Sequence, residues 1–269
     1  MKKIGIITGA TGGLGKEFVK LLIKENLDEV WCIARNIERL NELKNLSDKI
    51  VPISLDLSKV VSFNNYKLLL NDVDVVFLIN NASIGKMDKS ENFSLDEIDN
   101  TIDLNVKAMA KIINITLPFM NKGSHIVNLS SQSSFQPVPY INLYASTKAF
   151  ERNYSLALGR ELKGRGISVT CVTPGWVKTE MLLNEYNGVK VKFHHLALPE
   201  KVAAKAIKDA KKNKRYSVYS FYVKFMHLLS KIYSSRVLMN CWIFGIRKYI
   251  KRINTISFVF LCVFNSFCS

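Results

Sequence analysis

Thr8-Gly-Ala-Thr-Gly-Gly-Leu-Gly15 follows the apolar run Ile4-Gly-Ile-Ile7 and leads into a stretch with the pattern of an amphipathic helix. The glycines at 9, 13 and 15 allow a tight turn and a close approach of a ligand to the backbone. Free N–H groups at the start of the following helix can then bind a pyrophosphate group. The stretch predicts a strand, an anion-binding turn and a helix, although a glycine-rich turn after a strand can also be purely structural.

The same order of strand and helix recurs along the chain. Short apolar runs alternate with longer amphipathic stretches, which predicts repeated βα units around a parallel sheet. Several runs are apolar almost throughout, as expected for strands that are covered on both faces. Ser94-Leu-Asp-Glu97 is a capping box for one of the helices. The expected strands are residues 3–8, 29–34, 49–54, 73–80, 125–130 and 167–173, and the expected helices lie near residues 13–25, 37–46, 95–120 and 143–164.

These elements predict an α/β fold with a doubly wound, Rossmann-type sheet that is mainly parallel and flanked by helices. Right-handed crossovers bring the carboxyl ends of parallel strands to one edge, where ligands bind at the switch point of the strand order. Thr8 and Asn80 end the first and fourth expected strands, while Ser131 and Pro174 directly follow the fifth and sixth. We expect these residues to converge on that edge.

Tyr144-Ala-Ser-Thr-Lys148 lies thirteen residues after Ser131, in a stretch with helical spacing. On a helix, positions i and i+4 share a face, so the phenol and the ammonium group can point into one cleft. A phenol can protonate the alkoxide that forms when hydride reduces a carbonyl, and a nearby positive charge lowers its pKa of about 10. Ser131 can hydrogen-bond the substrate oxygen. Taken alone, Tyr-x-x-x-Lys also occurs where the tyrosine packs and the lysine is solvated.

The glycine turn, Asn80-Asn81-Ala82, Ser130-Ser131, the pair Tyr144 and Lys148, and Pro174-Gly175 follow one another along the chain. This ordered set closely resembles the short-chain dehydrogenase/reductase family, in its form of roughly 250 residues. The resemblance covers residues 2–179 and, more loosely, the chain to residue 220. It implies an NAD(P)-dependent oxidoreductase that acts on CH–OH or C=O groups. The implied catalytic residues are Ser131, Tyr144, Lys148 and Asn105, of which Asn105 helps to hold a proton-relay water.

The resemblance also implies the contacts to the cofactor. Asp56 matches an acidic contact to the adenine ring, but a helix cap explains it equally well. Thr179 would bind the nicotinamide carboxamide, although Pro174-Gly175 can also be simply a turn. Ser83 departs from the glycine that the family usually has at this position. The implied cofactor contacts outside the second strand are Thr8, Gly9, Thr11, Gly13, Leu14, Gly15, Asp56, Asn81, Ala82, Tyr144, Lys148, Pro174, Gly175 and Thr179.

The end of the second strand indicates which nicotinamide cofactor is preferred. An acidic residue there would accept from the ribose 2′-hydroxyl of NAD, whereas an arginine accommodates the 2′-phosphate of NADP. The sequence is Cys32-Ile-Ala-Arg35-Asn-Ile-Glu-Arg39, with no acid at the tip. We therefore predict that Arg35 contacts the phosphate and that NADP(H) is favoured over NAD(H). Arg39 is a weaker candidate that can equally be a solvated surface residue.

A loop over the substrate is expected at residues 180–198. Its apolar side chains suggest an apolar pocket. The adjacent histidines at 194 and 195 invite a metal or catalytic role, but such pairs on exposed loops usually have neither, and we predict no metal site. The apolar residues of this loop are Met181, Leu182, Leu183, Tyr186 and Phe193.

Composition indicates one main domain with an appendage. The chain has 269 residues, 48% of them hydrophobic, which suffices for one sizeable core. We assign residues 1–209 to a nucleotide-binding catalytic domain and residues 210–269 to a basic, aromatic-rich, helical extension. The five cysteines form no C-x-x-C pair, which fits a reducing, cytoplasmic setting. Glycines and Lys16-Glu17 interrupt the apolar amino terminus too early for a signal peptide.

The extension carries eleven Lys and Arg, no Asp or Glu, and thirteen of the 28 aromatic residues. Basic residues interleaved with aromatics suit an anionic membrane surface, so peripheral attachment to the inner face of a membrane is one interpretation. The others are packing on the domain and contact between subunits of a homo-oligomer. A membrane span from residue 253 onward is disfavoured because Asn254, Thr255, Ser257, Asn265 and Ser266 dilute it. No motif supports nucleic-acid binding.

We conclude from the sequence that the chain is an NADP(H)-dependent oxidoreductase, with Tyr144 as general acid and base. Its expected substrate is a carbonyl or secondary alcohol of an apolar, lipid-derived molecule. Family resemblance suggests 3-oxoacyl thioesters, steroid-like ketones or long-chain ketones, and the sequence does not choose among them. The alternative is a membrane-associated scaffold or cofactor sensor that keeps the fold without useful turnover.

Overall fold

The computed structural model describes residues 1–182, 185–186, 189–193 and 195–249. Its centre is a seven-stranded parallel sheet with the order β3-β2-β1-β4-β5-β6-β9, which confirms the doubly wound, Rossmann-type α/β fold. The order reverses between β1 and β4, so the switch point lies where these strands end. The strands are β1 (Lys2–Thr8), β2 (Glu29–Ala34), β3 (Ile50–Ser54), β4 (Val73–Asn80), β5 (His125–Leu129), β6 (Ser168–Val172) and β9 (Tyr216–Ser217).

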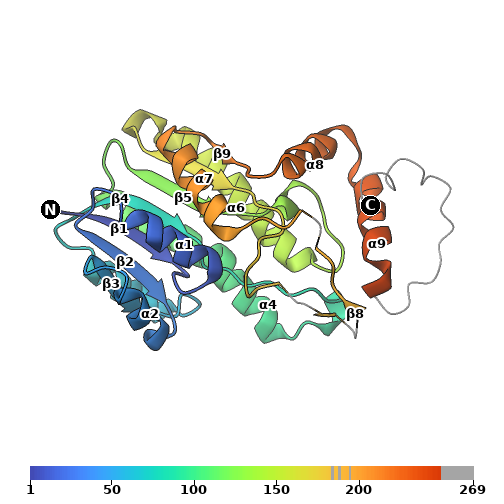
Figure 1. The fold of residues 1–269 in the computed structure, drawn as a ribbon, viewed down its shortest axis with the longest axis horizontal. Coiled ribbons are helices and arrows are strands. Elements are labelled where there is room, and N and C mark those ends of the chain that lie inside the picture. The colour runs from blue at the N-terminus through green and yellow to red at the C-terminus, as the bar shows by residue number, and fades with distance from the viewer. Residues whose placement is uncertain (183–184, 187–188, 194, 250–269) are drawn as a thin grey trace.

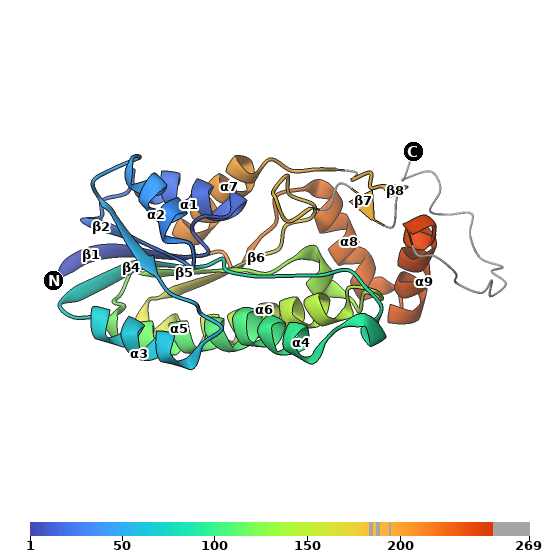
Figure 2. The same ribbon diagram turned by 90° about the horizontal axis from the view of Figure 1, so that it is seen from below.

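Helices cover both faces of this sheet, as Figure 2 shows. One face is covered by α1 (Gly13–Leu22), α2 (Ile37–Lys44) and α7 (Pro199–Lys211), and the other by α3 (Val60–Leu69), α5 (Met109–Thr116) and α6 (Asn142–Glu161). Each face has its own apolar core. Adjacent residues Ile6 and Ile7 of β1 are both fully buried and contribute to opposite cores. Covering of both faces explains why the strands read as apolar almost throughout.

The predicted helix at residues 95–120 is interrupted. The structure has α4 (Leu95–Ile102), a π-helical turn (Asp103–Ala108) and then α5. The capping box at the start of α4 is present, with Ser94 accepting from the Glu97 N–H and Glu97 accepting from the Ser94 N–H. Wider π turns often occur at functional sites. This one carries Asn105.

The sequence patterns did not predict α3, α7 or β9. α3 has no clear amphipathic pattern, because Val60, Val61 and Leu68 are exposed. α7 continues to Lys211, and β9 then joins the sheet beside β6. Asp209 ties these parts together, accepting from Ser217 Oγ at 2.9 Å and pairing with Lys205 and Lys214. The sheet therefore extends past residue 209, where we placed the end of the catalytic domain, and that division remains a prediction.

The described part of the extension contains α8 (Phe221–Ile232) and α9 (Ser235–Ile246). Both helices lie beyond the carboxyl ends of the strands, at the end of the molecule opposite to the amino terminus (Figure 1). Within the described residues, no helix combines the length and apolarity that crossing a membrane requires. The disfavoured span from residue 253 onward lies outside the described residues.

Candidate active site

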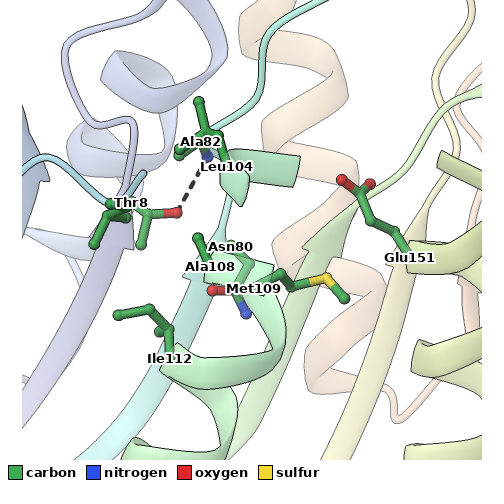
Figure 3. Close-up of a pocket in the computed structure, with 9 residues that line it drawn as sticks. Thr8, Asn80, Ala82, Leu104, Ala108, Met109, Ile112 and Glu151 are labelled. Carbon is green, nitrogen blue, oxygen red and sulfur yellow. Dashed lines mark hydrogen bonds between the residues drawn. The ribbon is translucent and has the colours of Figure 1, made fainter. Parts of the chain in front are cut away.

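Thr8 joins the ends of β1 and β4. Its hydroxyl oxygen accepts hydrogen bonds from the Asn81 N–H at 3.0 Å and from the Ala82 N–H at 3.1 Å; Figure 3 draws the second bond. The Asn81 side chain in turn donates to the carbonyl oxygens of Thr8 and Gly9. Thr8, Gly9, Asn81 and Ala82 are therefore brought together at the switch point of the sheet.

The glycine turn permits close backbone packing. Gly9 has φ +64°, and a Cβ atom on Gly15 would lie 2.1 Å from the Gly9 oxygen. Gly12 caps α1 without a side-chain hydrogen bond, which leaves N–H groups of the first turn for another acceptor. This donor set fits a pyrophosphate. Thr11 lies half-buried in the turn, and the half-buried side chain of Leu14 packs against the core.

Tyr144, Lys148 and Ser131 come together between α6 and the end of β5. Lys148 Nζ lies 5.4 Å from the centroid of the Tyr144 ring. Burial raises the pKa of Tyr144, while the positive charge of Lys148 and, less strongly, the nearby Ser131 hydroxyl act to lower it. A Cβ atom on Gly85 would lie 2.6 Å from the Tyr144 ring, so this glycine allows the ring to pack against the loop after β4.

Lys148 is almost completely buried. Its Nζ donates to the Leu129 carbonyl at 2.8 Å and to both carboxylate oxygens of Glu151 at 2.9 Å. Burial acts to lower the pKa of Lys148, but the negative charge of Glu151 raises it above its ordinary value. Burial raises the pKa of Glu151 to about 7, against the effect of Lys148. Sequence reasoning missed Glu151, although its i, i+3 spacing from Lys148 was a usable signal.

Asn105 is fully buried in the π-helical turn and binds the loop after β4. Its Oδ1 accepts from the Ile84 N–H at 2.9 Å, and its Nδ2 donates to the Ile84 oxygen and to Thr147 Oγ1. Thr147 belongs to α6, so Asn105 links this loop to the helix of Tyr144. The structure gives the side chain of Asn105 a role in holding two parts of the site together, and its proton-relay role stays a prediction.

Arg35 and Asp56 lie at the ends of β2 and β3. Arg35 is exposed directly after β2. Partial burial acts to raise the pKa of Asp56, but hydrogen bonds from Ser58 and the charge of Arg35 hold it below its ordinary value. Asp56 accepts from the Ser58 N–H and hydroxyl, as a turn residue would. Arg39 instead faces Glu180, at 3.5 Å, and both side chains are largely exposed.

The segment after β6 closes over the glycine turn. The Pro174 oxygen accepts from the Gln132 N–H at 2.8 Å, which ties this segment to the residues after Ser131. A Cβ atom on Gly13 would lie 2.7 Å from Thr179 Cγ2, and one on Gly175 would lie 2.9 Å from Val223 of α8. Thr179 thus lies over the turn, and α8 packs behind Gly175. Packing of the extension on the domain is therefore present in its described part.

An apolar cluster, which we call the outer wall, joins α9 to the loop after β4 and to the segment before α6. The Trp242 Nε1 donates to the oxygen of Pro139 at 2.9 Å, and Pro139 lies three residues before α6 begins at Asn142. From the predicted substrate loop, Phe193 packs against Trp176 and His195 stacks on Tyr222 of α8. Leu183 and His194 lie outside the described residues. The outer wall consists of Met87, Tyr140, Val191, Trp242, Ile246 and Tyr249.

Comparison with known proteins gives one family and several relatives. The family described as short chain dehydrogenase matches residues 3–189. An uncharacterized oxidoreductase of Staphylococcus epidermidis is 30% identical over 187 residues, which are 67% of this chain and 80% of that protein. The very-long-chain 3-oxoacyl-CoA reductase of Mus musculus is 30% identical over 65% of this chain, but only 60% of the mouse protein is covered. A short-chain dehydrogenase from Sphingobium yanoikuyae, solved in complex with NADPH, has a TM-score of 0.73 at 20% identity and covers 95% of this chain and 99% of its own.

Proposed function

Because the chain belongs to the short-chain dehydrogenase family, we propose that it is an NADP(H)-dependent oxidoreductase acting on a carbonyl or secondary alcohol of an apolar, lipid-derived substrate. The observation that carries this proposal is the grouping of Tyr144, Lys148 and Ser131 at the carboxyl edge of the sheet. The family and the oxidoreductase class are established by the comparisons. The cofactor preference, the substrate and the roles of individual residues are the proposed part.

Each residue of the site has its own role in the proposed reaction. A nicotinamide cofactor held at the glycine turn would supply or accept the hydride at the carbonyl carbon. Tyr144 donates a proton to the oxygen of that carbonyl in the direction of reduction, and Ser131 donates a hydrogen bond to the same oxygen. Lys148 stabilises the phenolate that Tyr144 becomes. Asn105 holds the loop after β4 against α6.

The raised pKa of Tyr144 sets the expected pH dependence. Burial keeps the phenol protonated near neutrality, so the acid needed for reduction is present there. Oxidation of an alcohol needs the phenolate, whose fraction grows as the pH rises toward the pKa. We therefore expect oxidation to accelerate with pH and reduction to be favoured near neutrality. Steady-state rates in both directions across pH 6 to roughly 10 would check this.

Preference for NADPH is supported by Arg35, which is exposed directly after β2. Its positive charge acts to lower the pKa of Asp56. Preference for an apolar substrate is supported by the outer wall and by the Trp176 and Phe193 pair. The name of the mouse relative adds one substrate class, the 3-oxoacyl thioesters.

The test is consumption of NADPH by the purified full chain with a panel of 3-oxoacyl thioesters of increasing acyl length, a steroid-like ketone and a short polar ketone. We expect kcat/KM to rise with acyl length. Equal rates for the short polar ketone would contradict an apolar pocket. If NADPH binds and no member of the panel is reduced, the scaffold or sensor without turnover becomes the better account.

We propose in addition that α8 attaches the chain peripherally to an anionic membrane. Its outward stripe is apolar: Phe221 is 83% exposed, Leu228 54% and Ile232 64%. These residues share one helical face, and Lys224 and Lys231 flank it, also exposed. An apolar stripe beside cations suits the boundary between lipid headgroups and acyl chains, and each cation contributes about 1 kcal/mol there.

Flotation of the full chain with vesicles containing phosphatidylserine tests this attachment. We expect binding to vanish in a Phe221→Ser, Ile232→Ser variant and to remain in Leu68→Ser, which removes an equally exposed apolar side chain from α3. Equal flotation of both variants would contradict the role of α8. The cytoplasmic setting and the homo-oligomer remain predictions, and sedimentation of the detergent-free chain would test the latter.

A further inference from the structure

Glu151 is a buried ionisable residue that the proposed chemistry does not use. It lies on α6 with 3% of its surface exposed, and both of its carboxylate oxygens contact Lys148 Nζ at 2.9 Å. We propose that Glu151 is a positioning residue, which holds the ammonium group of Lys148 in place and counters its charge toward Tyr144. This role rests on the proposed function, because it acts through Tyr144.

Burial of Glu151 costs free energy unless its charge is paired. A carboxylate removed from water is strongly destabilising unless it is paired and hydrogen-bonded. Glu151 and Lys148 are the only two fully buried charged side chains described on α6, and each is the ion-pair partner of the other. The third hydrogen bond of Lys148, to the Leu129 oxygen, comes from β5. The ammonium group of Lys148 is therefore held by two partners, the Leu129 oxygen and the carboxylate of Glu151.

Glu151 also lies close to the switch point of the sheet. Figure 3 shows it lining a small cavity across from Thr8, together with Asn80 at the end of β4. Asn80 donates to Asn128, Asn128 donates to Ser155 Oγ, and Ser155 donates to the backbone oxygen of Glu151. A buried polar network therefore runs from the switch point of the sheet to Glu151. Each of its bonds helps to fix the turn of α6 from which the carboxylate projects.

The charge of Glu151 also acts on Tyr144. Burial has the largest effect on the pKa of Tyr144 and raises it. The charge of Lys148 is the main effect that lowers this pKa, and the carboxylate of Glu151 acts against Lys148 and raises it. The other ionisable groups near the pair are Arg152 on α6 and Cys171 on β6. Burial raises the pKa of Cys171 to about 12, so this thiol stays neutral near neutral pH. Because burial raises the pKa of Glu151 to about 7, its carboxyl group is ionised throughout the pH range in which Tyr144 titrates, and it is the negative charge that opposes Lys148 at the phenol there.

The test is an NMR titration of the Tyr144 ring in protein labelled with ¹³C at the tyrosine Cζ, with the signal assigned by its loss in Tyr144→Phe. In Glu151→Gln, a neutral side chain of the same shape can still accept from Lys148. We expect the Tyr144 midpoint to fall by about one pH unit, because the charge of Lys148 is no longer opposed. An unchanged midpoint, or one that moves to higher pH, would overturn the proposal.

Glu161→Gln is the matched control, because Glu161 lies on the same helix and is exposed. Its Tyr144 midpoint should equal that of the wild type. If Glu151→Gln does not fold, Glu151→Asp keeps the charge but withdraws it by one methylene group. We expect this variant to turn over severalfold more slowly with an unmoved pH midpoint, and a wild-type rate would overturn the positioning role.

The titration requires no substrate, so the two proposals fail in different ways. A wild-type chain that reduces nothing would defeat the proposed function while the titration still reports on Glu151. If the wild-type chain reduces the substrate but the Tyr144 midpoint is the same in Glu151→Gln as in the wild type, only the proposed role of Glu151 is contradicted.

Discussion

The glycine turn (residues 8–15) and the outer wall are built by different means. The turn is held by hydrogen bonds between backbone groups and short polar side chains, as in the bonds from Asn81 and Ala82 to Thr8. The outer wall is held mainly by apolar contact between segments far apart in the chain, together with hydrogen bonds such as those from Trp242 to Pro139 and from the Lys192 N–H to the Tyr249 hydroxyl. The comparison teaches that cofactor binding should depend on backbone geometry that tolerates little change. Substrate preference should depend on side-chain volume that can change freely.

Tyr144→Phe tests the proton donor, which belongs to neither region. The variant keeps the ring that packs on Gly85 but loses the proton donor, so we expect kcat to fall by about 10²- to 10⁴-fold. NADPH affinity should change little. Rates of NADPH oxidation and NADPH titrations would check both values. Tyr154→Phe, on the same helix, should retain activity, and a comparable loss there would mean that the effect is not chemical.

Gly15→Ala tests the rigidity of the turn. The added Cβ would meet the Gly9 oxygen at 2.1 Å, and backbone on both sides prevents relief. We expect the free energy of unfolding to fall by about 1–3 kcal/mol and NADPH affinity to fall by roughly a hundredfold. Thermal unfolding and NADPH titration measure these effects. Gly12→Ala is the control, because its Cβ would lie 3.6 Å from the nearest atom, and equal losses in both variants would remove the distinction.

Arg35→Ala tests the cofactor preference at the edge of the same region. A charge-assisted contact is worth about 1.5–3 kcal/mol, which corresponds to roughly ten- to a hundredfold in affinity. NADPH binding should weaken by that factor, whereas NADH binding should not change. Titration of each cofactor against each protein measures the difference. Arg39→Ala should leave both affinities near the wild-type values, and an equal loss there would assign the phosphate to Arg39 instead.

Trp242→Ala tests the outer wall and should have the smallest effect. Loss of the indole enlarges the wall without touching the glycine turn, so we expect KM for long-chain 3-oxoacyl thioesters to rise by about tenfold, as for roughly 1.4 kcal/mol of lost contact. NADPH affinity should stay at the wild-type value. Val237→Ala, an exposed site on the same helix, is the control. A change in NADPH affinity in Trp242→Ala would mean that the two regions are coupled.

The difference between the regions also explains what could be predicted from the sequence. The sheet, the turn and the helix of Tyr144 follow from local patterns, because apolar runs, glycine spacing and i, i+4 pairs are visible in a short window. The outer wall brings Met87 together with residues more than a hundred positions later, and no short window records such contacts. The π-helical turn at Asn105 was missed for the same reason, since it accompanies bonds with Ile84 twenty-one positions earlier. Glu151 was overlooked because a charge one turn along a helix usually indicates a solvated face.

The most direct test of hydride transfer uses NADPH deuterated at both C4 positions, with the purified full chain and a long-chain 3-oxoacyl thioester. Mass spectrometry of the reduced product would show where the label goes. The account predicts one deuterium on the new carbinol carbon of every product molecule, and a yield of this product that is about 10²- to 10⁴-fold lower with Tyr144→Phe at equal incubation. Binding of NADPH without labelled product, across the whole substrate panel, would contradict the account and leave a protein that binds the cofactor without using it.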